Sequence, residues 1–224
     1  FGDILYVGNK SYTDQQLNTL LKIEKGDVYN GAVLKERITG DGSPTSEDIQ
    51  TLYQNNGFLF SSVNAVETKV VNDSITVEVR IREDEKATIN KVSIVGNDKT
   101  NDFVIFRELR VKPGSLFSRN AIIRSIREIG QLGFFDTNVT PDVKPNYQDK
   151  TADIEFSVIE KGGSQIELQG GYGGGSFIGT LGLSFNNFSV RNLFKKSAYK
   201  PLPMGDGQSL SLRLQTSRTF NTYS

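Results

Sequence analysis

Few residue types in this chain could carry chemistry. Its 224 residues include no histidine and no cysteine, which removes the commonest general base, the usual partner of a nucleophilic serine, thiolate metal sites and disulfides. The densest carboxylates are Glu83, Asp84 and Glu85, within the charged run RIREDEK at residues 80–86. Basic residues adjoin these acids and supply local partners, so we interpret the run as a solvated strand end and linker. We therefore expect a protein that is not an enzyme.

A second candidate for ligand chemistry is the glycine-rich segment GGYGGG at residues 170–175. It does not fit G-x-G-x-x-G, and no helix pattern follows it, so we expect no nucleotide cofactor. The acidic segment TGDGSPTSED at residues 39–48 lacks the spacing of a calcium-binding loop, and we interpret it as an inserted surface loop. We therefore expect no cofactor and no bound metal.

The charge balance also limits the partners. The chain has 26 basic and 26 acidic residues, so it has no electrostatic footprint for nucleic acid and no polybasic membrane patch. No apolar run reaches the roughly 20 residues of a membrane helix, and the start FGDILYVGN has no features of a signal peptide. We expect either a mature fragment or a chain that never carried such a signal.

An internal repeat organises most of the chain. Residues 6–38 align without a gap to residues 94–126 at an offset of 88, which matches Gly8 with Gly96. Further on, NNGFLFSSV matches QLGFFDTNV at an offset of 76, which matches Gly57 with Gly133. The first copy therefore has 12 extra residues, which we place around the loop at residues 39–48.

Each copy predicts the element order β-α-α-β-β. A short strand pattern, DILYV or NKVSIV, ends at Gly-Asn, two residues that tolerate positive φ. Thr13 and Gln16 have the spacing of a capping box at the start of the first helix, and Ser118 can cap the second helix of the second copy. Two alternating strand patterns close each copy. The predicted fold class is α+β.

Three further strand patterns follow the second copy. They are QIELQGGYG, FIGTLGLSFN and QSLSLRLQT, each with apolar residues on one parity and polar or small residues on the other. A transmembrane β-strand needs roughly 9 to 11 residues with this alternation. A soluble sheet with one buried face has the same pattern, so these strands leave both interpretations open.

The order of these segments resembles two tandem POTRA domains followed by the start of an Omp85-superfamily barrel. The resemblance rests on Val-Gly-Asn after the first strand of each copy, on the later Asn-Gly-Phe and Leu-Gly-Phe-Phe, on the junction VIEKGGSQIELQGGYGGG, and on NNFSVRNLF. It covers essentially the whole chain. It implies POTRA domains at residues 1–86 and 87–161 and, at residues 162–224, the first three strands of an incomplete transmembrane antiparallel β-barrel.

The resemblance implies the central component of the outer-membrane β-barrel assembly machinery. Such a protein lies in the bacterial outer membrane with its POTRA domains in the periplasm, binds unfolded outer-membrane β-barrel proteins, and inserts them into the lipid at its barrel seam. Two alternatives remain: a two-partner secretion transporter of the same superfamily, and a soluble adhesion or interaction module. Further POTRA repeats before Phe1 would favour the assembly factor over the transporter, and detergent dependence would exclude the soluble module.

The resemblance also implies two sets of site residues. In FRELR, toward the end of the first helix of the second copy, Glu108 would contact an accessory periplasmic lipoprotein, flanked by Arg107 and Arg110. An ordinary exposed helix face is the alternative. The backbone of the first barrel strand would be the edge that pairs with client strands: Gln165, Ile166, Glu167, Leu168, Gln169 and Gly170. For the glycines that follow, a tight hairpin is the alternative.

The segment at residues 186–208, NNFSVRNLFKKSAYKPLPMGDGQ, is long for a hairpin connection. Its apolar and basic residues suit the periplasmic boundary of a membrane, where aromatic and cationic side chains are favoured: Phe188, Leu193, Phe194, Lys195, Lys196 and Tyr199. A loop folded beneath the barrel is the alternative.

Overall fold

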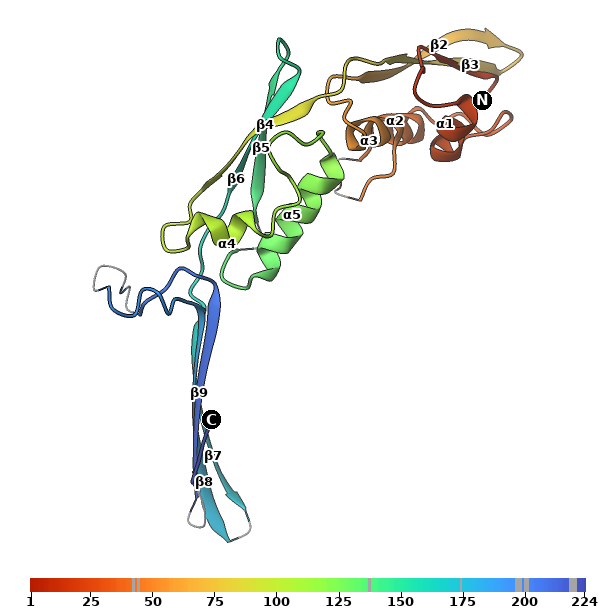
Figure 1. The fold of residues 1–224 in the computed structure, drawn as a ribbon. Coiled ribbons are helices and arrows are strands. Elements are labelled where there is room, and N and C mark those ends of the chain that lie inside the picture. The colour runs from red at the N-terminus through yellow and green to blue at the C-terminus, as the bar shows by residue number, and fades with distance from the viewer. Residues whose placement is uncertain are drawn as a thin grey trace. The chain divides into compact units, whose positions relative to one another are not determined.

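The computed structural model describes residues 1–41, 43, 45–136, 138–173, 175–195, 199, 202–217 and 221–224. The described residues form three sheets, which follow one another along the chain (Figure 1). The chain divides into two compact units. One consists of Phe1–Ser93, Arg110–Arg124 and Val143–Ile154, and the other of Ile94–Leu109, Ser125–Asp142 and Glu155–Ser224.

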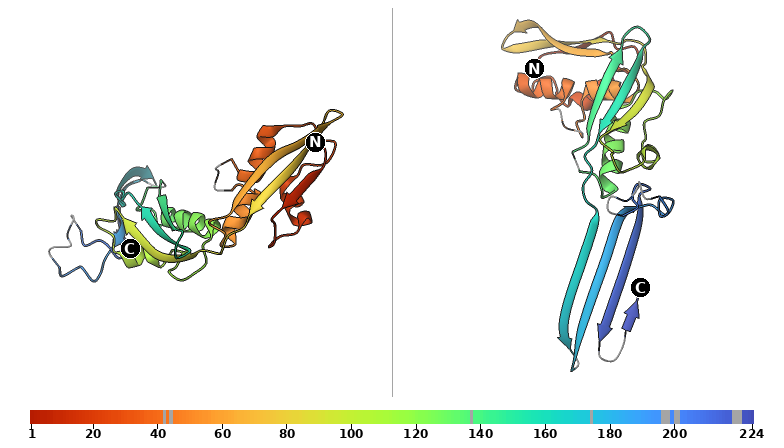
Figure 2. Two further views of the ribbon diagram at one scale, coloured as in Figure 1. Left: turned by 90° about the horizontal axis from the view of Figure 1, so that it is seen from above. Right: turned by 90° about the vertical axis from the view of Figure 1, so that its left-hand side faces the viewer.

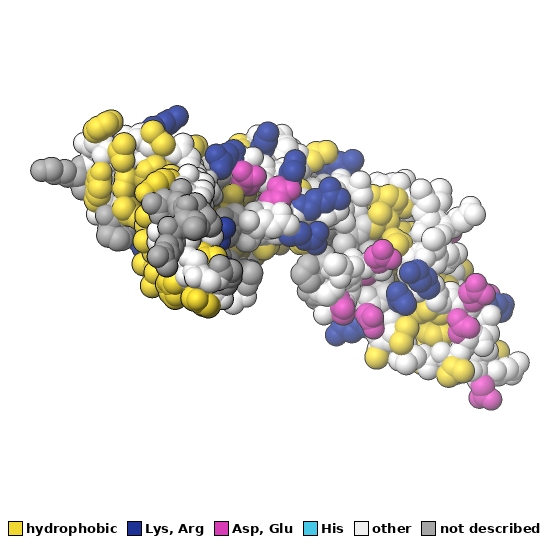
Figure 3. Space-filling view, turned by 90° about the horizontal axis from the view of Figure 1, so that it is seen from below, with side chains coloured by type: hydrophobic (Ala, Val, Ile, Leu, Met, Phe, Trp, Pro, Cys, Tyr) yellow, Lys and Arg dark blue, Asp and Glu magenta, His cyan; other side chains and the backbone are white. Residues whose placement is uncertain are grey.

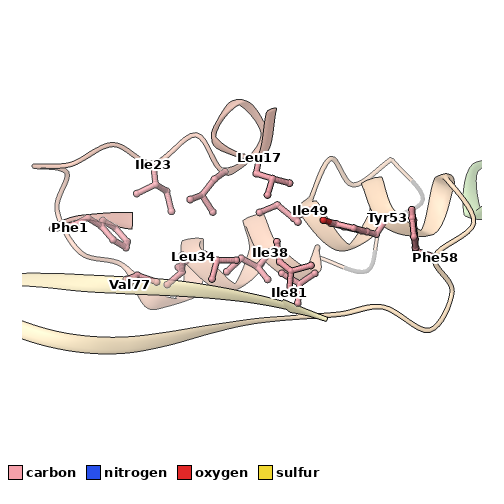
Figure 4. Packing of buried hydrophobic residues seen from close by; sticks show 13 residues of the cluster. Phe1, Leu17, Ile23, Leu34, Ile38, Ile49, Tyr53, Phe58, Val77 and Ile81 are labelled. Atoms are coloured by element: carbon pink, nitrogen blue, oxygen red, sulfur yellow. The ribbon is translucent and has the colours of Figure 1, made fainter. Parts of the chain in front are cut away.

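The first module combines three strands with three helices. Its elements are β1 (Ile4–Val7), α1 (Asp14–Leu21), α2 (Gly31–Thr39), α3 (Ile49–Asn55), β2 (Ser62–Val71) and β3 (Ser74–Arg82). The sheet order is β1-β3-β2, with β1 parallel and β2 antiparallel to β3. The helices lie over one face of the sheet, and the buried core fills the space between them (Figure 4). Its fully buried members include Leu17, Leu21, Ile49, Tyr53, Val77 and Val79.

The structure has three helices in this module, whereas the sequence led us to expect two. α2 begins 88 residues before the second helix of the second module, and α3 ends 76 residues before that helix ends. The 12-residue insertion therefore interrupts a helix. Gly40 ends α2 with a φ of 78°, and the Asp48 side chain caps α3 by accepting from the Thr51 amide at 2.8 Å.

The predicted capping box at the start of α1 is confirmed. The Gln16 amide donates to the Thr13 hydroxyl, and the Thr13 amide donates to the Gln16 side chain. α1 ends at Leu21, and the residue that caps it, Lys22, has a φ of 52° in the left-handed region. The local signals in the sequence therefore set where α1 begins, and the apolar stripe that includes Leu17 and Leu21 sets the face that it buries.

The second module repeats the arrangement with two helices. Its elements are β4 (Thr88–Val95), α4 (Asp102–Phe106), α5 (Arg119–Gln131), β5 (Thr140–Asn146) and β6 (Thr151–Ser157). The sheet order β4-β6-β5 corresponds to β1-β3-β2. The Ala121 amide donates to the Ser118 hydroxyl at 3.3 Å, so the predicted cap of α5 is present. The mixed α+β fold is confirmed.

The Gly-Asn pairs after β1 and β4 have a steric origin. Gly8 and Gly96 both have a φ of 91°, and a Cβ atom at either position would lie 2.0 Å from a carbonyl oxygen, that of Ile81 or Val158. Each following asparagine holds the turn: Asn9 donates to the Tyr12 carbonyl, and Asn97 donates to the Thr100 carbonyl. Only glycine fits the close approach of these backbones.

A third sheet follows the second module. Its strands are β7 (Ser164–Gly173), β8 (Ser176–Phe188), β9 (Gln208–Ser217) and β10 (Asn221–Tyr223), in the order β10-β9-β8-β7. Neighbouring strands are antiparallel, and Figure 2 shows them side by side in its right-hand view. We expected three strands here; the short β10, which pairs with β9 through Tyr223 and Leu214, is a fourth.

Candidate functional site

The third sheet has one apolar face. Cross-strand registers form two rows of apolar residues across β7, β8 and β9: Ile166, Leu183 and Leu212, and next to them Leu168, Leu181 and Leu214. Ile166 and Leu168 are 72% and 77% exposed, and Tyr172 and Phe177 at the far end of the strands are also exposed. Figure 3 shows hydrophobic side chains gathered over this part of the molecule. Water does not favour so large an apolar surface.

The opposite face of the same sheet is polar. Glu167 pairs with Gly182, which in turn pairs with Arg213, and the Glu167 carboxylate lies 3.6 Å from the Arg213 guanidinium. The Ser184 and Ser211 hydroxyls lie 3.4 Å apart, and Gln169 donates to Glu167. The strands therefore carry apolar residues on one face and small or polar residues on the other, the pattern of strands in transmembrane barrels.

The predicted pairing strand lies at the end of this sheet. Gln165 to Gly170 all belong to β7, and β8 is the neighbour of β7 among the described residues. In an antiparallel pair, alternate residues direct their N–H and C=O groups away from the partner strand. β7 therefore presents backbone donors and acceptors along its outer edge.

The glycines of this segment have separate roles. Gly170 pairs with Gly179 inside the ladder, and a Cβ on Gly170 would lie 3.2 Å from the Phe177 ring. The ladder continues to the pair Gly173 and Ser176, and Gly175 has a φ of 79°. The expected alternative, a tight hairpin, is thus present at the end of β7, while Gly170 accommodates an aromatic ring from β8. Gly174 lies outside the described residues.

The predicted partner-binding residues lie just beyond a helix. α4 ends at Phe106, so Arg107 and Glu108 lie in the turn that follows it and not in the helix. The Arg107 Nε donates to the Glu108 carboxylate at 2.9 Å, and both side chains remain partly exposed to solvent. Arg110 is exposed and belongs to the other compact unit.

The acidic run at residues 80–86 differs from the expected solvated linker. The Glu83 carboxylate accepts three hydrogen bonds, from the amides of Lys10 and Ser11 and from the Tyr53 hydroxyl, at 2.8, 2.9 and 2.8 Å. Asp84 forms an ion pair with Lys150 at 3.0 Å. The charges therefore have distant partners as well as sequence neighbours, because the fold brings β1, α3 and the end of β3 together.

Hydrogen bonds lower the pKa of the Glu83 carboxylate. Burial raises the pKa of Glu83, but the hydrogen bonds from Ser11, Tyr53 and Lys10 outweigh burial, and the net pKa lies below its ordinary value. Glu160 makes equivalent contacts in the second module, where its carboxylate accepts hydrogen bonds from the amides of Lys99 and Thr100 at 2.9 and 2.7 Å. Sequence reasoning missed this pair, although a glutamate follows the last strand of both copies.

No cluster of acidic residues among those described could hold a metal ion. No helix in the described part of the chain is long and apolar enough to cross a membrane.

The modules define the class of the protein. The sequence matches the POTRA family, described as a surface antigen variable number repeat, over residues 1–84 and 87–161. The chain therefore belongs to the POTRA family.

Individual relatives carry a more specific name. Outer membrane protein assembly factor BamA of Neorickettsia risticii (strain Illinois) is 28% identical over 100% of this chain and 29% of its own length. BamA of Neisseria meningitidis serogroup B is 29% identical over 91% of this chain and 23% of its own length. These homologues support the resemblance to Omp85-type assembly factors that the sequence indicated.

A solved structure extends the likeness. The crystal structure of BamA from Haemophilus ducreyi lacking POTRA domains 1-3 has a TM-score of 0.70 at 20% identity, over 97% of this chain and 37% of that one. At this identity the likeness concerns the fold. The chain spans between 23% and 29% of the length of the curated relatives that it matches.

Proposed function

We propose that the chain is part of an outer-membrane β-barrel assembly factor. In this proposal residues 1–86 and 87–161 are periplasmic POTRA domains, and residues 162–224 begin a transmembrane antiparallel β-barrel in the bacterial outer membrane. The protein is not an enzyme and uses no cofactor. The observation that carries the proposal is the third sheet: directly after two POTRA modules, it exposes one apolar face and presents the edge of its terminal strand.

The dimensions of the sheet support a membrane location. β7 and β9 each have 10 residues, and a transmembrane strand needs roughly 9 to 11. The apolar face would contact lipid and the face with Glu167 and Arg213 would face the lumen, since lipid-facing and lumen-facing residues alternate in barrels. A soluble sheet would need another element to cover Ile166 and Leu168, which are exposed here.

The edge of β7 would then act on clients. Unfolded outer-membrane β-barrel proteins would bind the POTRA domains and add strands to the backbone of Gln165–Gly170, because an unpaired strand edge is a template for pairing. The glycines support this role, since glycine in a strand weakens its packing and permits the close approach of another backbone. Folding of the client in lipid would supply the free energy.

Accessory subunits would bind the second module. Glu108 lies in an exposed turn, so its carboxylate is accessible to a partner even though Arg107 contacts it. We assign Arg107, Glu108 and Arg110 to the contact with a BamD-like periplasmic lipoprotein. The balanced charge of the chain gives no support to nucleic acid as a partner.

Site-specific photocrosslinking in living cells tests the proposed pairing edge. A photoreactive amino acid would replace Gln165 or Gln169 in β7 of the full-length protein, with Gln215 in the inner strand β9 as the matched control. Crosslinks to newly made outer-membrane β-barrel proteins are expected from β7 and not from Gln215. Equal crosslinking from both strands, or none from β7, would overturn the role of this edge.

A further inference from the structure

The segment between β8 and β9 has a firmly held base. Asn187, Ser189 and Asp206 are buried polar residues near its two ends. The Ser189 hydroxyl donates to the Asp206 carboxylate at 2.7 Å, and the Gly205 and Gly207 amides donate to the backbone and side-chain oxygens of Asn187 at 2.8 and 2.9 Å. Buried polar groups that are satisfied in this way fix a single backbone arrangement.

The same base is fastened to the turn before α4. The Asn187 side chain donates to the Thr100 hydroxyl at 2.8 Å, within a buried setting. Asn101 uses its side chain to donate to Asp206 and its backbone amide to donate to the Gly205 carbonyl, both at 2.9 Å. The two ends of the segment, next to β8 and β9, are therefore held against the turn before α4.

The tip of this segment exposes apolar side chains beyond its base. Phe194 is 92% exposed and Val190 is 58% exposed, with Leu193 and Tyr199 partly exposed beside them. The Tyr199 hydroxyl donates to the Leu193 carbonyl at 2.6 Å, which ties the two sides of the tip together. Apolar side chains that are held together in water in this way mark a surface that interacts with a partner or a membrane.

Cations accompany these apolar residues. Arg191 and Lys195 lie on either side of Leu193 and Phe194, and Arg191 stacks over the Phe103 ring of α4 at 5.7 Å. Aromatic and basic residues together favour the headgroup layer, where rings enter the acyl boundary and cations approach phosphates. Lys196 lies outside the described residues.

We propose that the tip, defined as Val190–Lys195 with Tyr199, binds the phospholipid headgroup layer beside the barrel. This inference rests on the proposed function, because the apolar sheet face sets the membrane level. The tip leaves from Phe188 and returns at Gln208, so it lies at the end of the strands that carry Phe185 and Leu210. With that face in hydrocarbon, the strand ends reach the headgroups, and the base near Asn187 holds the tip at this depth.

Fluorescence quenching by lipid-attached nitroxides tests this depth. An environment-sensitive fluorophore would be attached to a single cysteine in the full-length protein, in place of Phe194, Leu168 or Val28. Val28 is a matched control, since it is an apolar residue in the first module and is 90% exposed. The protein would be reconstituted in phosphatidylethanolamine and phosphatidylglycerol vesicles that carry nitroxides near the headgroup or near the chain end.

Each position has a distinct expected result. At position 194, headgroup nitroxides should quench at least about twofold more strongly than at position 28, since the fluorophore lies at the interface. At position 168, chain-end nitroxides should quench more strongly than headgroup nitroxides.

Quenching at 168 without quenching at 194 would overturn the role of the tip and leave the membrane sheet intact. Absence of quenching at 168 would overturn the proposed function itself. A blue-shifted emission at 194 without quenching would show that protein covers the tip and would also overturn the inference.

Discussion

At the level of single residues, the turn after the first strand of each module depends on three residues. Gly8 permits the close approach of Ile81, Asn9 holds the turn, and Glu83 accepts the amides that follow. Gly96, Asn97 and Glu160 do the same in the second module. The Val-Gly-Asn signal is therefore one part of a tertiary contact with the end of the last strand.

Replacement of Gly8 by alanine should be strongly destabilising. The new Cβ would lie 2.0 Å from the Ile81 carbonyl oxygen, so the strands would have to separate, at an expected cost of about 3 kcal/mol or more. The control is Gly26→Ala, where φ is 101° but no atom lies within 4 Å, and the cost should be about 1 kcal/mol. Urea unfolding of a fragment with residues 1–161 measures both. Equal losses would show that backbone conformation alone, and not the close approach, explains Gly8.

Replacement of Glu83 by glutamine should remove a pH-dependent stabilisation. The folded-state pKa lies below the ordinary value of 4.5, so the carboxylate stabilises the fold above that pH and loses this contribution as pH falls through the folded pKa. At about pH 7, Glu83→Gln should lower the free energy of unfolding by about 2 kcal/mol, the scale of hydrogen bonds to a charged group. The difference should shrink toward about pH 3.

The exposed neighbour Glu85 supplies the control for this measurement. Glu85→Gln should leave the free energy of unfolding nearly unchanged at both pH values, since the side chain is exposed. A deficit of Glu83→Gln that stayed constant with pH would contradict an electrostatic role for the carboxylate.

Charge reversal at Glu108 tests the proposed accessory contact. Glu108→Lys should reduce co-purification of a periplasmic lipoprotein with the full-length protein at least about tenfold, the effect of losing a charged pair worth about 1.4 kcal/mol or more. Glu85→Lys, also at an exposed position, is the control and should retain the partner. Retention of the same lipoprotein by both variants would remove Glu108 from the interface.

At the scale of elements, the third sheet separates its two faces residue by residue. Leu168 belongs to the apolar face, where it pairs with Leu181, and Gln169 belongs to the polar face, where it pairs with Thr180. Adjacent positions of one strand therefore offer a matched comparison, because only one of them would contact lipid.

An arginine in place of Leu168 should weaken membrane assembly of the full-length protein. On a lipid face the cost of arginine is about 2–4 kcal/mol near the midplane, whereas Gln169→Arg would place the same charge toward the lumen. The fraction that resists urea extraction from outer membranes should fall for Leu168→Arg and match the wild type for Gln169→Arg. The same yield for both variants would favour a soluble sheet.

The elements also show where sequence reasoning succeeds. The capping box of Thr13 and Gln16 involves residues close in sequence, so spacing alone identified it. The split between α2 and α3 was harder to see, because the offsets located the 12-residue insertion without showing that helix resumes at Ile49. The partners of Glu83 lie 72 and 73 residues away, and no local pattern contains them. Glu108 lies beyond α4 because that helix ends after only one turn and a half, a boundary that periodicity does not fix.

Over the full length of the chain, two POTRA modules are followed by a sheet that has one apolar face. The internal repeat and the alternation of the last strands predicted this order from the sequence. The fastening of Asn187 and Asp206 to Thr100 and Asn101 was not predictable, since it joins residues far apart in the chain. The family match establishes the modules. The role of the sheet in client insertion is our proposal, and it is argued from the exposed apolar face and the outer edge of β7.

The most direct test of the proposed assembly function is conditional depletion of the full-length protein in its own bacterium, followed by quantitative proteomics of the outer membrane. If the protein is an assembly factor, we expect a broad fall of unrelated β-barrel proteins, because their insertion would need the edge of β7. Loss of one secreted protein with the other barrel proteins unchanged would contradict it and would identify a two-partner secretion transporter.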